Sequence, residues 1–145
     1  MFSKFSFWIW ATVVMQLLTA VFHAIGLFVS QPPANDIEKQ MMELVTTYKI
    51  DAGAGFKPTF MNLFTALSAC FSLLCLLGGF INLYLYRKNA PAVIFKGVLG
   101  ISLLIFTVCF ALMASFTFLP PVVCTGLIVL FLSGAWVTIK KQPSL

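Results

Sequence analysis

The sequence predicts an all-α integral membrane protein, a four-helix up-down-up-down bundle with an amphipathic extracytoplasmic loop helix between the first and second membrane helices. Of its 145 residues, 61% are hydrophobic and only 9% are charged, whereas soluble domains carry about 25% charged residues. A soluble domain of this size could not bury so much apolar surface. All four acidic residues lie in one hydrophilic segment, residues 30–59, and long apolar runs precede and follow it. We therefore expect a single transmembrane domain over residues 1–145.

The four apolar runs are residues 5–29, 60–86, 92–119 and 122–139. Each is close to or above the ~20 residues that cross a bilayer as a helix, and lipid offers no partner for backbone groups in any other conformation. The first run exceeds the roughly 7–15 residues of a usual signal-peptide core, so we interpret it as a retained span. Because the later links are short, consecutive helices are expected to be antiparallel neighbours.

The distribution of lysine and arginine predicts the orientation. With four spans, both termini lie on one side of the membrane, together with the link between the second and third spans. That side carries six basic residues and no acid: Lys4, Arg87, Lys88, Lys96, Lys140 and Lys141. The positive-inside rule places it in the cytoplasm. These residues flank apolar runs and form no separate basic patch, so we expect membrane lipid as a partner and no nucleic acid.

The extracytoplasmic loop is predicted to contain one helix, at about residues 35–48. Asn35 is a good N-cap, and Glu38 three residues later completes a capping-box pattern. Apolar side chains then recur on one face at helical spacing: Ile37, Met41, Leu44, Val45 and Tyr48. This helix either lies on the membrane or caps the bundle, or it is a lid over a cavity. The glycine-rich residues 51–55 are expected to be flexible.

Small and hydroxyl-bearing residues predict the inward face of each span, because they let membrane helices approach closely. In the first span they are Thr12, Gln16, Thr19, His23, Gly26 and Ser30. In the second they are Asn62, Thr65, Ala69, Ser72 and Gly79, with Ser68, Cys75 and Asn82 at the margin. In the third they are Gly97, Gly100, Thr107, Ala111, Ala114 and Ser115. We interpret these stripes first as packing surfaces.

A candidate polar site follows from the cost of strongly polar side chains inside a membrane. His23, Asn62 and Ser115 lie near the outer ends of their spans, where they form either an interhelical hydrogen-bond cluster or a small pocket. The hypothetical ligand-binding residues are Gln16, His23, Asn62, Thr65, Ser115 and Tyr48. No catalytic set, metal site or cofactor is predicted, since there is one histidine and the four cysteines lie within spans without a CxxC pair.

Several short motifs resemble a known family. They are His23-Ala-Ile-Gly26, Pro33-Ala-Asn-Asp-Ile-Glu38, Met42-Glu-Leu with Tyr48, and Gly78-Gly79-Phe-Ile-Asn82-Leu in a span that begins at Phe60. Over about residues 23–85 the chain resembles a small uncharacterised bacterial four-span integral membrane protein family. The resemblance implies the four-span fold and a bacterial inner (plasma) membrane, and it implies no activity.

Three functions are compatible with these observations. The first is a non-enzymatic accessory or assembly component of a membrane complex, favoured by the lack of catalytic groups and by 16 phenylalanines. The second is a bundle that binds lipid or a hydrophobic small molecule, with residues 35–48 as its lid. The third is an intramembrane enzyme with His23 as general base, which would need Tyr48, Asp51 or Asn62 beside the imidazole.

Overall fold

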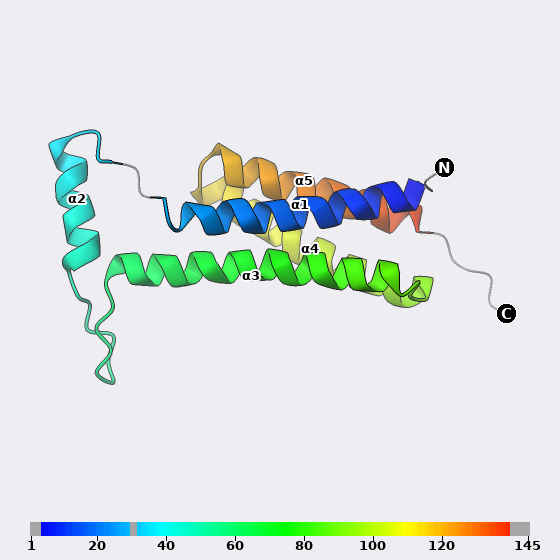
Figure 1. The fold of residues 1–145 in the computed structure, drawn as a ribbon, viewed down its shortest axis with the longest axis horizontal. Helices are drawn as coiled ribbons and strands as arrows, with labels where there is room; N and C mark the ends of the chain where they lie inside the picture. The colour runs from blue at the N-terminus through cyan, green and yellow to red at the C-terminus, as the bar shows by residue number, and fades with distance from the viewer. Residues whose placement is uncertain (1–3, 30–31, 140–145) are drawn as a thin grey trace. The chain divides into compact units, whose positions relative to one another are not determined.

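The computed structural model describes residues 4–29 and 32–139, and these residues form five α-helices (Figure 1). They are α1 (Lys4–Gly26), α2 (Asp36–Thr47), α3 (Phe60–Arg87), α4 (Ala92–Phe116) and α5 (Leu119–Thr138). The described residues contain no strand beyond one isolated bridge between Lys49 and Thr59. α1, α3, α4 and α5 are long and apolar enough to cross a membrane. The all-helical class and the four candidate spans are therefore confirmed.

Three span ends differ from the prediction by three residues: α1 ends at Gly26, α4 ends at Phe116 and α5 begins at Leu119. α1 ends at Gly26, and the amides of Leu27 and Phe28 bond back to carbonyls three residues earlier. α5 begins at Leu119, so Pro120 and Pro121 lie in its first turn and not in the link before it. The backbone N–H of a residue in the first turn has no hydrogen-bond partner within the helix. Proline, which lacks this N–H, is therefore acceptable there. The link between α4 and α5 is correspondingly short.

The chain divides into two compact units. The first unit comprises residues 1–19 and 75–145, and the second comprises residues 20–74. α4 and α5 belong wholly to the first unit, α2 belongs wholly to the second, and α1 and α3 contribute to both. Each unit is described separately below.

The buried positions of the first unit recur along each helix at steps of three, four or seven residues. They are Ile9, Thr12, Val13 and Gln16 on α1; Cys75, Gly79 and Asn82 on α3; Phe95, Leu99 and Phe106 on α4; and Thr125, Ile128, Leu132 and Ala135 on α5. Alternation of three and four matches the 3.5-residue period of helices that pack at a shallow crossing angle. Each helix therefore contributes one narrow seam to this core.

Two of these seams differ from the predicted faces. On α3, Cys75 and Asn82 were expected at the margin, yet both are completely buried. On α4, large side chains form the buried seam, and most of the predicted small-residue stripe is exposed: Gly97, Thr107, Ala111, Ala114 and Ser115. The hydroxyls of Thr107 and Ser115 donate to carbonyls of their own helix at 2.7 and 2.9 Å. They therefore need no neighbouring helix, and their presence did not mark an interface within the unit.

α4 and α5 pack as an antiparallel pair. A side chain at Gly126 of α5 would lie 3.2 Å from the ring of Phe110, and one at Gly100 of α4 would lie 3.4 Å from the indole of Trp136. Lys96 Nζ lies 4.6 Å from the centre of the Trp136 ring, a cation–π contact at the same end of the pair. Residue numbers therefore rise along α4 as they fall along α5.

In the second unit, α2 has the predicted N-terminal cap. The Asn35 side chain accepts a hydrogen bond from the Glu38 amide at 2.9 Å. The Glu38 carboxylate reaches back one residue further than in a standard capping box and accepts from the Ala34 amide at 2.7 Å. These bonds provide partners for amides that the start of a helix leaves unpaired.

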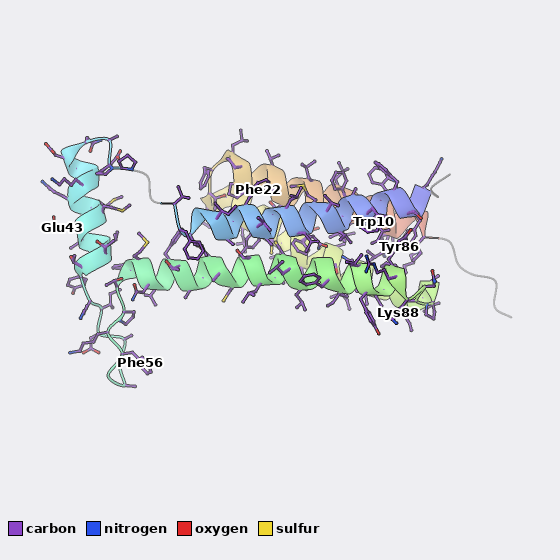
Figure 2. The ribbon with its side chains drawn as sticks, viewed as in Figure 1. Trp10, Phe22, Glu43, Phe56, Tyr86 and Lys88 are labelled. Atoms are coloured by element: carbon purple, nitrogen blue, oxygen red, sulfur yellow. The ribbon has the colours of Figure 1, made fainter. Side chains whose placement is uncertain are left out.

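The segment after α2 forms a small hairpin with Phe56 near its tip (Figure 2). The Ile50 amide donates to the Pro58 carbonyl at 2.8 Å, and the Ala52 amide donates to the Phe56 carbonyl at 3.0 Å. Gly53, Ala54 and Gly55 have φ angles of 81°, 49° and 83°, a region that glycine adopts readily. The segment expected to be flexible is thus a hydrogen-bonded turn, in which two glycines supply the required backbone conformation.

Gly134 offers a test of how tightly the first unit is packed. A Cβ at Gly134 would overlap the ring of Trp8, whereas a Cβ at Gly97 would meet nothing within 4 Å. We expect Gly134→Ala to lower the free energy of unfolding by about 1–3 kcal/mol, the usual cost of an overpacked core. The matched Gly97→Ala change should not lower it, since alanine is the better helix former. Unfolding in mixed detergent micelles measures both, and a Gly134→Ala protein as stable as wild type would contradict the close packing.

Candidate functional site

The most deeply buried polar contact of the first unit joins α1 to α3. Gln16 and Asn82 are both completely buried, and the Asn82 side-chain amide donates to Gln16 Oε1 at 3.1 Å. The prediction that Gln16 points inward is confirmed, and its partner is a residue that had been placed at the margin of the α3 face. Hydrogen bonds of this kind contribute roughly 0.6–2 kcal/mol to helix association in membranes.

Two glycines of α3 make room for this contact. A Cβ at Gly78 would lie 2.7 Å from Gln16 Nε2, and a Cβ at Gly79 would lie 3.0 Å from the side chain of Leu17. The Gly78–Gly79 pair therefore lets the α1 side chains reach the backbone of α3. Its role in this sequence is steric.

Only two of the four polar side-chain atoms of the amide pair take part in this hydrogen bond. Gln16 Nε2, a donor, and Asn82 Oδ1, an acceptor, are both buried without a partner among the described residues. A rotation that brought these two atoms together would close a second bond within the same pair. Two neutral amides offer neither a nucleophile nor an acid, so the geometry suits helix attachment and not catalysis.

His23 belongs to the second unit and lies against an aromatic ring. Its imidazole meets Phe71 edge to face, with ring centres 5.1 Å apart. The Nε2 atom is buried and has no hydrogen-bond partner within the described part of the chain. Within the second unit this atom therefore forms no direct hydrogen bond to Asn62, one of the two expected partners.

The predicted site residues other than Gln16 and His23 are exposed. Asn62 is exposed and bonds to Thr59, whose hydroxyl donates to Asn62 Oδ1 at 3.0 Å. Thr65 and Tyr48 are exposed. Ser115 belongs to the first unit, where it is exposed and bonded to its own helix. Asn62 therefore acts with Thr59 as a cap for the start of α3.

A recess of about 1060 Å³ opens in the first unit where α1 and α4 begin and α3 and α5 end. Figure 2 shows Tyr86 of α3, Lys88 just after α3, and Trp10 of α1 toward this end of the unit. The Tyr86 hydroxyl donates to Ser6 at 3.0 Å across the α1–α3 contact. The residues that line the recess include Lys4, Phe5, Arg87, Asn89, Phe95 and Val137.

Sequence reasoning missed this recess, although the signal for it was present. The basic residues at the helix ends were used only to orient the spans, and the links were treated as turns. The size of a recess depends on how far the four helix ends diverge. The spacing of apolar residues along the sequence gives no information on that distance. Its cationic lining could have been inferred from Lys4 and Arg87, which end neighbouring spans on one side.

Comparison with known proteins gives no match. No protein-family model fits the chain, and no curated protein or solved structure is significantly similar to it. The resemblance to small bacterial four-span proteins therefore stays a prediction.

The role of the amide pair can be measured with a double-mutant cycle. Gln16→Leu or Asn82→Leu alone should destabilise the protein, because each leaves a buried amide without its partner. The double replacement should cost less than the sum of the two, with a coupling of about 0.6–2 kcal/mol. Unfolding free energies in detergent micelles give the cycle, and additive losses would show that the two side chains do not stabilise each other.

Proposed function

We propose that this protein is a non-enzymatic accessory or assembly component of a membrane complex. It would span a bacterial inner membrane four times in up-down-up-down order, with both termini in the cytoplasm and α2 outside. The four long apolar helices support the spanning character, and the charge distribution supports the orientation. The association with a partner is supported by one feature of α4.

That feature is the outward face formed by Gly97, Thr107, Ala111, Ala114 and Ser115, called here the α4 small face. All five residues are exposed. Leu104, which is 68% exposed, projects from the middle of this face. Large apolar residues occupy a different exposed side of the same helix, among them Ile94, Ile105 and Leu112.

The two exposed sides of α4 suit different neighbours. Branched apolar side chains are favourable in lipid, so the side with Ile105 needs no protein partner. Small residues are concentrated where membrane helices contact one another, because they let the backbones approach closely. On a side that faces only lipid, glycine and alanine would not bring two helix backbones together. The α4 small face therefore supports docking of a helix from another membrane protein, with Leu104 as a side chain that the partner would have to accommodate.

The other two functions have less support. In the lid proposal the apolar face of α2 would cover a ligand, yet Ile37, Met41, Leu44 and Tyr48 are between 58% and 79% exposed. In the enzyme proposal His23 would need a hydrogen-bonded partner at Nε2, and this atom has none among the described residues. Asp51 instead accepts from the Gly53 amide within the hairpin.

The proposed orientation predicts which positions a membrane-impermeant thiol reagent reaches. The test uses protein with its four native cysteines replaced by alanine and one new cysteine at Ala54 or Asn89. We expect Ala54→Cys to react in intact cells, and Asn89→Cys to react only after the membrane is permeabilised. The reverse pattern would show that the orientation is inverted, and equal reactivity from one side would contradict the number of spans between them.

The α4 small face can be tested by site-specific photocrosslinking in the membranes of the source cell. We expect a photoreactive residue at Ser115 to give a product with a different membrane protein, and the same residue at Ile105 to give lipid adducts. Ala111→Leu should reduce the Ser115 product about tenfold or more by preventing close approach.

Ile105→Leu on the other side of α4 is the matched control and should leave the Ser115 product unchanged. Lipid adducts alone at Ser115 would contradict the proposal. A product with the mass of two copies would also contradict it, because it would identify a homo-oligomer.

A further inference from the structure

The recess in the first unit carries positive charge that no residue of that unit neutralises. Lys4 and Arg87 line it, and Lys88 and Lys96 belong to the same unit. The sequence has no aspartate or glutamate in residues 1–19 or 75–145. Charges at a membrane surface of low dielectric attract counterions strongly. No aspartate or glutamate of the unit can pair with these two residues, which favours an anion from outside the unit as their partner.

The helix dipoles do not supply this charge. α1 and α4 begin at the recess and α3 and α5 end there, so two positive and two negative helix ends largely cancel. The field in the recess is therefore that of the Lys4 and Arg87 side chains. Lys96 is held over the Trp136 ring at 4.6 Å, away from the residues that line the recess.

Part of the wall of the recess is apolar. Phe5 and Phe95 lie edge to face with ring centres 5.3 Å apart, and Leu85, Val137 and Ile139 are among the other apolar residues that line it. A volume of about 1060 Å³ is at the upper end of small-molecule sites, roughly 300–1,000 Å³. A free phosphate or a nucleotide would neutralise the charges and leave these rings in contact with water. A molecule that carries a phosphate directly beside hydrocarbon covers both surfaces.

We propose that the recess binds one anionic glycerophospholipid. Lys4 and Arg87 hold its phosphate, since ammonium and guanidinium groups are the side chains that bind phosphate best, and its glycerol and upper acyl chain lie along Phe5 and Val137. The position fits this ligand, because the recess lies where four candidate spans begin or end. This site is independent of the α4 small face and of the proposed partner protein.

The experiment measures binding of phosphatidylglycerol and phosphatidylcholine to the full-length protein in detergent by native mass spectrometry. Phosphatidylglycerol should bind at least about tenfold more tightly than phosphatidylcholine, and Lys4→Gln with Arg87→Gln should remove that preference. Lys88→Gln is the matched control, because Lys88 neighbours Arg87 and is exposed but does not line the recess. It should change the affinity less than about twofold.

A second variant tests the recess without altering any charge. Ala90 lines the recess, so Ala90→Phe should weaken phosphatidylglycerol binding by occupying the space. Thermal unfolding of each variant confirms that it is folded.

Three results would overturn the proposal. Equal affinity for the two lipids would show no anion preference. Equal losses for Lys88→Gln and the Lys4/Arg87 pair would show diffuse surface attraction and no site. Displacement of the lipid by inorganic phosphate at millimolar concentration would identify free phosphate as the ligand.

Discussion

The absence of water around a membrane helix is the constraint on which the rest of this structure depends. Without water, backbone N–H and C=O groups find hydrogen-bond partners by forming helices. Most side-chain hydroxyls find a partner in a carbonyl of their own helix. Thr12, Thr125 and Ser133 each donate to the carbonyl four residues earlier, at 2.7–2.9 Å. A side-chain amide has too many donors and acceptors for its own helix to satisfy. Gln16 and Asn82 therefore find each other, and this pair fixes how α1 lies along α3 in the first unit.

The contrast between groups that bond within their own helix and groups that need a neighbouring helix explains which parts of the fold could be predicted. Hydropathy and length were sufficient for four candidate spans, because the requirement for ~20 apolar residues acts on composition. The cap at Asn35 was predictable because its chemistry is local. The packing faces were only partly predictable. Thr107 and Ser115 do not mark a packing face within the first unit, because they are exposed there and their hydroxyls bond to Leu103 and Ala111 of their own helix.

The candidate site shows a similar division. Gln16 was identified correctly as inward-facing from its polarity alone, but its partner depends on the rotation of α3 about its axis. The observed buried residues on that helix follow alternating steps of four and three: Ser68, Ser72, Cys75, Gly79 and Asn82. Thr65 lies seven residues before Ser72, on the line of this seam, yet it is exposed, as is Asn62 near the start of the helix. A polar residue near a helix start also has a local use, and Asn62 caps α3 together with Thr59.

The charges and the core of the first unit have complementary roles. Its buried polar contacts are neutral, so helix attachment through Gln16 and Asn82 involves no desolvated ion. Its cations lie instead at the helix ends, where Lys4 and Arg87 remain exposed. Because the unit contains no aspartate or glutamate, no acidic side chain of the unit can neutralise them, and an anionic membrane lipid is a suitable partner. The residues that favour one orientation in the bilayer are thus the ones left available to bind an anionic lipid, so orientation and lipid recognition would draw on a single set of side chains.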